Sequence, residues 1–151
     1  MSQSTIDCRE ACRDDLPAIL ALHAQPDMYD GKELSLEQAQ QLFERMTAYP
    51  HNRLYVAERD GVTVGTFTLL IMDSLGHAGA PVAVVEDVVV DPGQQRQGVG
   101  KAMMNFAMQL SEQQGCYKLM LSSHLNRTRA HAFYDGLGFE RHGFSFSCNL
   151  G

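Results

Sequence analysis

Apolar residues along this chain recur with two periods, about two residues in some segments and about 3.6 residues in others. Segments with the shorter period or with β-branched runs predict strands, and segments with the longer period predict helices. The predicted strands cover residues 6–11, 54–58, 62–72, 82–90, 117–122 and 139–148. The predicted helices cover residues 14–23, 35–49, 98–114 and 127–136. Because the two kinds of element interleave without a linker or an internal repeat, the pattern predicts an α/β sandwich around a mixed sheet.

Short local signals predict where several of these elements begin and end. Ser35 followed by Gln38 forms a capping-box pair at the start of the second helix, and Pro50 ends that helix. Residues 59–61, Arg-Asp-Gly, predict a hairpin turn between two strands. Loops rich in polar residues or glycine are predicted at residues 25–34 and 73–81.

Composition and charge narrow the class of protein. The 151 residues are enough for about one domain, which would bury roughly two thirds of its unfolded surface. A net charge of −6 disfavours nucleic acid as the main partner and is compatible with cationic, amine-bearing substrates. No segment is apolar for long enough to span a membrane, and residues 1–5 lack the apolar region of a leader. The four cysteines have no zinc or redox spacing, so we expect reduced thiols in a cytoplasmic protein.

Residues 86–101 carry the strongest chemical signal in the chain. A β-branched strand leads into a polar turn, and two glycines, Gly98 and Gly100, then open a helix. Backbone N–H groups at the start of a helix lack partners within the helix, and the helix dipole favours negative charge there. Glycine lets a ligand approach the backbone because it has no Cβ atom. The segment therefore predicts a loop that binds an anion.

Three kinds of anion-binding loop are distinguished by their spacing. A nucleoside triphosphate loop needs GxxxxGK, and here Gly93 and Gly98 have the spacing but Val99 stands in place of the lysine. A dinucleotide loop needs GxGxxG, and Met103 stands in place of the third glycine. The remaining pattern, Gln or Arg followed by xxGxG, fits residues 95–100, Gln-Arg-Gln-Gly-Val-Gly. This loop resembles the coenzyme A pyrophosphate loop of the GCN5-related N-acetyltransferase (GNAT) superfamily.

A second segment, residues 126–139, supports the same resemblance. Members of that family have an Asn after a strand, then a short helix with a Phe-Tyr pair, and then a Leu-Gly-Phe ending. This chain has Asn126, then Phe133 and Tyr134, then Leu-Gly-Phe at residues 137–139. The resemblance implies a single domain over residues 1–151, with a mixed, mostly antiparallel sheet of about six to seven strands and about four helices.

The resemblance also implies acetyl-CoA as the acyl donor. The backbone of one strand would pair with the pantetheine arm, the glycine-containing loop would bind the pyrophosphate, and Asn126 would bind the cofactor or an ordered water. The implied cofactor-binding residues are Val88, Val89, Val90, Gln95, Arg96, Gln97, Gly98, Val99, Gly100, Lys101, Asn126 and Tyr134.

Two catalytic roles follow from the resemblance together with the needs of the reaction, in which the amine loses a proton and the departing thiolate gains one. Tyr134 is similar to the family's tyrosine beside the thioester sulfur, and a usual tyrosine pKa of about 10 keeps the proton on at pH 7. Glu86, on the strand before the loop, could take the amine proton directly or through water. The alternatives are a packing role for Tyr134, a salt-bridge or solvated role for Glu86, and His77 or His142 as the base.

Other reactive residues lack a spacing that would support a different chemistry. His77, His124, His131 and His142 show no metal-ligand spacing, so we predict no metal site. Cys116 precedes an apolar strand, which favours a buried structural thiol over a nucleophile. No GxSxG nucleophile turn occurs in the chain.

The sequence thus predicts an N-acetyltransferase that moves the acetyl group of acetyl-CoA to the primary amine of a small molecule, by direct transfer in a ternary complex. Residues 86–87 and 115–118 are similar to glucosamine-phosphate acetyltransferases, and residues 130–134 and 142–146 to aminoalkylphosphonate acetyltransferases. The alternatives are a catalytically silent module that binds acyl-CoA, and an acetyltransferase of protein N-termini or lysines. A homodimer is expected from the resemblance, and neither nucleic acid nor a membrane is expected as a partner.

A phosphorylated acceptor would need a second basic cluster. The cations available for such a cluster are Lys32, Arg53, Arg127, Arg129 and Arg141.

Overall fold

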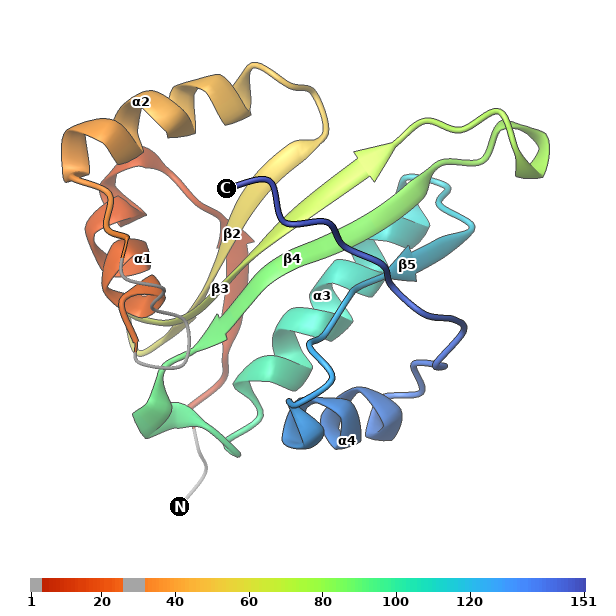
Figure 1. The fold of residues 1–151 in the computed structure, drawn as a ribbon. Helices are drawn as coiled ribbons and strands as arrows, with labels where there is room; N and C mark the ends of the chain where they lie inside the picture. Colours follow the sequence, from red (N-terminus) through yellow and green to blue (C-terminus); the bar gives the residue numbers. More distant parts are fainter. Residues whose placement is uncertain (1–3, 26–31) are drawn as a thin grey trace. The chain divides into compact units, whose positions relative to one another are not determined.

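The computed structural model describes residues 4–25 and 32–151 (Figure 1). The chain divides into two compact units, Met1–Met120 and Leu121–Gly151, which are described separately. The first unit contains β1 (Asp7–Glu10), α1 (Leu16–His23), α2 (Leu36–Thr47), β2 (Asn52–Arg59), β3 (Val62–Met72), β4 (Val82–Val90), α3 (Val99–Gln113) and β5 (Lys118–Met120). Short 3-10 turns occupy Arg13–Asp15, His77–Gly79 and Pro92–Gln94. The second unit contains α4 (Thr128–Gly136).

The first unit is built on one five-stranded sheet with the order β1-β2-β3-β4-β5. Neighbouring strands run antiparallel except at one edge, where β4 and β5 are parallel. The α/β class and the mixed, mostly antiparallel sheet are therefore confirmed, and β3 and β4 have the bounds that the sequence predicts. The sheet has fewer strands than the six to seven expected.

Helices cover both faces of this sheet, with α1 and α2 on one side and α3 on the other (Figure 1). Alternation along β2 explains the division, because successive side chains point to opposite faces. Val56 belongs to the buried cluster that contains Leu16 of α1, whereas Tyr55 stacks on Phe67 and meets the edge of Phe106 of α3.

Gly65 of β3 allows α3 to approach the sheet closely. A Cβ atom at this position would lie 2.8 Å from the sulfur of Met103 and 3.1 Å from a methyl group of Val99. Both of these helix side chains are fully buried, at 0% and 1% exposure. The first turn of α3 is therefore anchored directly on β3.

The second unit consists of α4 and the segments on either side of it. The ring of Tyr134 makes edge contacts with Phe133 and Phe139, at centroid distances of 5.2 and 5.7 Å. The prediction of a final strand at residues 139–148 is wrong, because the structure assigns no strand there. A strand needs a partner for its backbone N–H and C=O groups, and the unit to which these residues belong contains no other strand.

Two further segments differ from simple loops or fall outside the description. The predicted loop at residues 73–81 contains a 3-10 turn, and the His77 ring in that turn stacks on Tyr117 at a centroid distance of 3.9 Å. Part of the predicted loop at residues 25–34 lies outside the described residues.

Within residues 4–25 and 32–151, every helix is too short or too polar to cross a membrane.

Candidate active site

A β-bulge interrupts β4 in the middle of its otherwise buried run. Thr68 of β3 pairs with Glu86 and Thr66 pairs with Val89, so Asp87 and the next residue of β4 together oppose one residue of β3. Asp87 has a φ of +53°, a left-handed conformation that is uncommon for residues other than glycine. Glu86 and Asp87 are exposed, although most of the strand is buried or half-buried. The bulge thus turns two carboxylates out of the sheet at one point.

The edge of β4 beyond this point is open toward β5. The parallel pairing joins only Val82, Ala83 and Val84 to β5. Within the described residues of the first unit, the rest of β4 has a strand partner on its β3 side only. The backbone groups of Val88, Val89 and Val90 on the other side are therefore placed where an extended ligand could pair with them.

The start of α3 has the features of an anion-binding site. Gly98 precedes the helix with a φ of +85°, and a Cβ atom there would meet nothing within 4 Å. No side chain caps the helix, and its first turn contains no acidic residue. The N–H groups of this turn therefore have no protein acceptor from a capping side chain, and the helix dipole makes them attractive to phosphate. This donor set fits the phosphate groups of acetyl-CoA.

The structure brings the predicted loop residues together around that helix start. Gln95, Arg96 and Gln97 form the turn that leads to Gly98, and Val99, Gly100 and Lys101 form the first turn of α3. Val99 can offer only its backbone, because its side chain is buried under the sheet. Gln97 also has a structural role, because its amide nitrogen donates to the carbonyl oxygen of Gly93 at 3.3 Å.

Arg59, at the end of β2, holds this loop in place and was not identified from the sequence as a site residue. Its guanidinium donates to the side-chain oxygen of Gln94 at 2.8 Å, to the side-chain oxygen of Gln97 at 2.7 Å and to the carbonyl oxygen of Gln97 at 3.0 Å. In the sequence, this arginine indicates only a hairpin turn. Its partners lie 35 and 38 residues away, so no local pattern could have revealed the contact.

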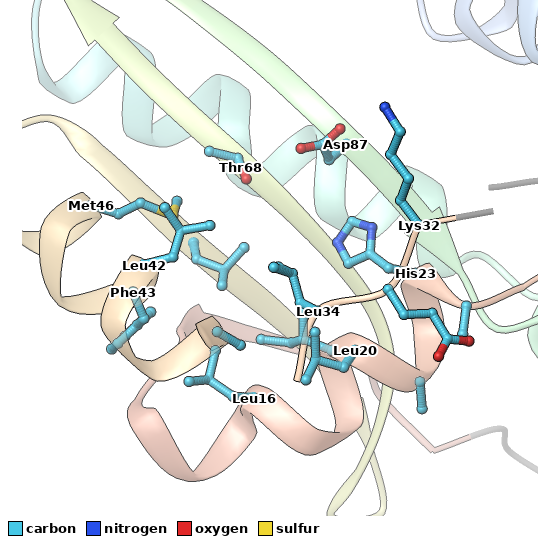
Figure 2. A pocket seen from close by; sticks show the side chains of 16 residues that line it. Leu16, Leu20, His23, Lys32, Leu34, Leu42, Phe43, Met46, Thr68 and Asp87 are labelled. Atoms are coloured by element: carbon cyan, nitrogen blue, oxygen red, sulfur yellow. The ribbon is translucent and has the colours of Figure 1, made fainter. Parts of the chain in front are cut away.

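A cavity of about 600 Å³ lies between α1, α2 and the sheet (Figure 2). Its described lining comprises Leu16, Ile19, Leu20, Ala21, His23, Ala24, Lys32, Glu33, Leu34, Ala39, Leu42, Phe43, Met46, Leu54, Thr68 and Asp87. In Figure 2, Asp87 of the bulge lies toward the end with His23 and Lys32, and Leu42 and Phe43 lie toward the other end. Asp87 lines this cavity, and Glu86, which the sequence predicts as the base, does not.

The two remaining predicted site residues, Asn126 and Tyr134, belong to the second unit. The backbone N–H of Asn126 donates to the His124 ring at 3.1 Å. Burial raises the pKa of the Tyr134 phenol above its usual range, and the positive charge of Arg127 opposes part of this shift. The phenol therefore keeps its proton at neutral pH. Their position relative to β4 stays a prediction.

The structure also locates the residues considered for other chemistry. His77 lies before the start of β4, at the opposite end of that strand from the loop, and His142 is exposed in the second unit. Burial raises the pKa of the Cys116 thiol, which disfavours a nucleophilic thiolate. Across residues 4–25 and 32–151, no group of three or more His, Cys, Asp or Glu side chains is arranged to hold a metal ion.

Comparison with known proteins identifies the family. The model of the acetyltransferase (GNAT) family matches residues 16–139, which span both units. The chain belongs to this family, and the resemblance seen in the sequence is confirmed.

Individual relatives agree with this assignment. Glucosamine 6-phosphate N-acetyltransferase of Trypanosoma brucei brucei is 34% identical over 90 residues, which span 60% of this chain and 59% of that enzyme. Aminoalkylphosphonate N-acetyltransferase of Salmonella typhimurium strain LT2 is 26% identical over 93% of this chain and 89% of that enzyme. A solved structure from Agrobacterium tumefaciens strain C58, assigned as an acetyltransferase, is 32% identical and matches 95% of this chain and 99% of that chain with a TM-score of 0.88.

Proposed function

We propose that this protein is an acetyl-CoA-dependent N-acetyltransferase that acts on the primary amine of a small molecule by direct transfer in a ternary complex. The observation that carries the proposal is the uncapped start of α3, which directly follows a bulged strand with an open edge. The family to which the chain belongs supports the donor. The names of the two curated relatives support a small-molecule amine as acceptor, with amino sugars and aminoalkylphosphonates as the suggested classes.

In this proposal the donor lies along β4 and ends at α3. Val88, Val89 and Val90 would pair with the pantetheine arm as an added strand, and residues 95–101 would bind the pyrophosphate. Acetyl-CoA supplies a thioester carbonyl that an amine can attack. The rigid strand and loop would hold that carbonyl beside the acceptor, so that orientation supplies much of the rate.

Proton transfers are assigned to two further residues. Tyr134 would donate a proton to the departing thiolate, which the raised pKa of its phenol supports because the proton stays on at neutral pH. Glu86, which the bulge exposes, would take the amine proton directly or through water. Asn126 would bind the cofactor or an ordered water.

We also propose that the two units function as one domain. We further propose that the protein is a homodimer, which light scattering would test.

Calorimetry and a thiol-release assay test the function as a whole. We expect acetyl-CoA to bind and the free thiol to appear only when an acceptor amine is present. Binding of acetyl-CoA without thiol release across amino sugars, aminoalkylphosphonates, alkylamines, polyamines and peptides would instead support a silent acyl-CoA-binding module. Release with peptides alone would support a protein acetyltransferase.

The variant Tyr134→Phe tests the general acid. We expect kcat to fall about 100-fold, because the departing thiolate would lose its proton donor, while the KM for acetyl-CoA stays within about threefold. Tyr49→Phe, which alters an exposed tyrosine, is the matched control. Unchanged turnover in Tyr134→Phe would leave this residue only a packing role.

A further inference from the structure

We propose that the acceptor is a primary amine attached to an apolar alkyl or aryl group, and that the cavity between α1, α2 and the sheet binds that apolar group. This inference rests on the proposed function, because it concerns the acceptor of the same reaction. It departs from the acceptor classes that the names of the two relatives described above suggest, a phosphorylated amino sugar and aminoalkylphosphonates.

Most residues that line the cavity are apolar, and several of their side chains are partly accessible to solvent. Leu20 of α1, Leu42 and Met46 of α2 and Leu54 of β2 are half-buried, and Leu34 is 47% exposed. Apolar side chains around a hollow with a few polar groups are typical of small-molecule sites. An apolar ligand group placed there would remove both its own surface and that of these side chains from water.

The charged groups of the lining suit an ammonium group better than a phosphate. The lining contains the carboxylates of Glu33 and Asp87, the basic side chains of His23 and Lys32 and, in its described part, no arginine. Binding a phosphate away from water requires several charge-assisted hydrogen bonds, which arginine supplies most effectively.

Two of the four arginines in the candidate basic cluster form ion pairs with carboxylates. Arg53 forms an ion pair with Glu10 at 3.2 Å and donates to the carbonyl oxygen of Thr47 at 3.3 Å. Arg141 pairs with Asp135 at 2.7 Å within the second unit. Among the described residues that line this cavity, Lys32 is the one member of the candidate basic cluster.

The position of Asp87 sets the direction in which the acceptor would lie. Asp87 is part of the bulge of β4, the strand proposed to hold the pantetheine arm, and its carboxylate would attract the ammonium form of the acceptor to that strand. Because Glu86 does not line the cavity, the ammonium would lose its proton to Glu86 through water before the neutral amine attacks the thioester. In Figure 2 the apolar side chains of Leu42 and Phe43 lie away from this end. An amine at Asp87 would therefore extend its apolar group toward α2.

A chain-length series of acceptors tests the inference. With n-propylamine, n-butylamine, n-pentylamine and n-hexylamine, we expect kcat/KM to rise about fourfold per methylene until the cavity is filled. We expect glucosamine 6-phosphate and 2-aminoethylphosphonate to show kcat/KM at least tenfold below n-hexylamine. A flat series, or a phosphorylated acceptor that exceeds n-hexylamine, would overturn the inference.

A pair of variants on one helix locates the effect. Leu42→Gln places a polar group in the cavity wall, and we expect it to reduce kcat/KM for n-hexylamine about tenfold while the KM for acetyl-CoA stays unchanged. Leu36→Gln is the control, because Leu36 lies on the same helix, is 43% exposed and is not among the lining residues. Equal effects of the two variants would contradict the assignment of the cavity.

The results separate this inference from the function on which it rests. If amines are acetylated but phosphorylated acceptors are preferred, the inference fails and the N-acetyltransferase proposal stands. If acetyl-CoA binds and no amine accepts an acetyl group, both proposals fail.

Discussion

The first N–H groups of a helix have no acceptors within the helix, and the starts of α2 and α3 differ in what else the protein offers to them. At α2, the Ser35 hydroxyl accepts from the N–H of Gln38 at 3.1 Å, and the Gln38 side chain accepts from the N–H of Ser35 at 2.9 Å. At α3, the corresponding position is Gly98, which has no side chain to offer and no acidic residue after it in the first turn. At α2, side chains of the protein accept from N–H groups of the first turn. At α3, no capping side chain does so, and the N–H groups can donate to a ligand.

The start of α3 therefore lacks the side-chain hydrogen bonds that stabilise the start of α2. A capping side chain contributes about 1 kcal/mol relative to alanine but only about a few tenths relative to glycine, so Gly98 leaves the N–H groups of α3 available at little cost in stability. An external anion could then satisfy these donors when the ligand is present. The surrounding structure is otherwise well supported, since α3 is anchored on Gly65 and its loop is held by Arg59.

The largest expected effect comes from a negative charge at the start of α3. We expect Gly98→Asp to weaken acetyl-CoA binding about 30- to 100-fold, because the carboxylate would compete for the N–H groups and repel the pyrophosphate. Gly98→Asn has a similar size and a similar tolerance of positive φ, and should lose less than about tenfold. Calorimetry measures both affinities. Equal losses would assign the effect to backbone strain rather than charge.

A third helix start, at the 3-10 turn before α1, is completed by Asp15 and gives a pH-dependent test. Its carboxylate accepts two bonds from Arg9, at 2.7 and 2.8 Å, and one from the N–H of Cys12 at 2.8 Å. The bonds from Arg9 are the main reason that the pKa of Asp15 lies at about 2. Because this is below the unfolded value of about 3.9, the stabilisation is complete above about pH 4 and is lost as the pH falls toward 2.

We therefore expect Asp15→Asn to lower the free energy of unfolding by about 1 to 2 kcal/mol at pH 7, a range reduced by the partial exposure of Arg9. Near pH 2 the difference from the wild type should largely vanish. Urea unfolding at the two pH values measures it, and Asp14→Asn, an exposed aspartate in the same turn, is the control. A difference that persists at pH 2 would contradict an ionic origin.

Loosening the loop before α3 should weaken the donor site without adding charge to it. We expect Arg59→Met to raise the KM for acetyl-CoA about tenfold with little change in kcat, because it removes three hydrogen bonds to Gln94 and Gln97. Arg59→Lys should lie between this variant and the wild type. With S-acetylpantetheine, which lacks the pyrophosphate, Arg59→Met should match the wild type. An equal loss with both donors would point to general destabilisation.

The smallest effect is expected at α2. Ser35→Ala should lower the free energy of unfolding by about 1 kcal/mol, because the N–H of Gln38 loses its acceptor. Acetyl-CoA affinity should stay within about twofold. Urea unfolding and calorimetry on the same preparation measure the two quantities, and a clear loss of affinity would show that the two helix starts are coupled.

Features that depend on residues close together in the chain were predicted correctly, and a feature that depends on a distant partner was not. The Ser35–Gln38 capping box and the bounds of β3 and β4 depend on neighbouring residues and on alternation, and each was predicted as the structure has it. Residues 139–148 also alternate in the manner of a strand, but alternation cannot supply the partner that a strand requires. This prediction failed because a strand also needs a partner strand, which the alternation of residues 139–148 does not reveal.

The residues of the candidate site also differ in whether neighbouring residues or distant ones define their role. The loop at residues 95–101 was predicted from its own spacing, because an anion site at a helix start is built from consecutive backbone groups, and its role as a binding site stays a prediction. Arg59 and Asp87 were missed, since one acts through partners 35 and 38 residues away and the other depends on a register shift against β3. A bulge of this kind depends on how two strands pair, so the sequence of one strand alone does not predict it.

The family, the acyl donor that the family implies and the loop expected to bind it could be predicted from the sequence, because these depend on residues close together in the chain. The side chains that surround the cavity beside β4 could be identified only in the folded protein, because α1, α2 and three strands of the sheet each contribute part of its wall. In our proposals the loop binds the donor through its backbone, and the cavity binds the acceptor through side chains that folding brings together.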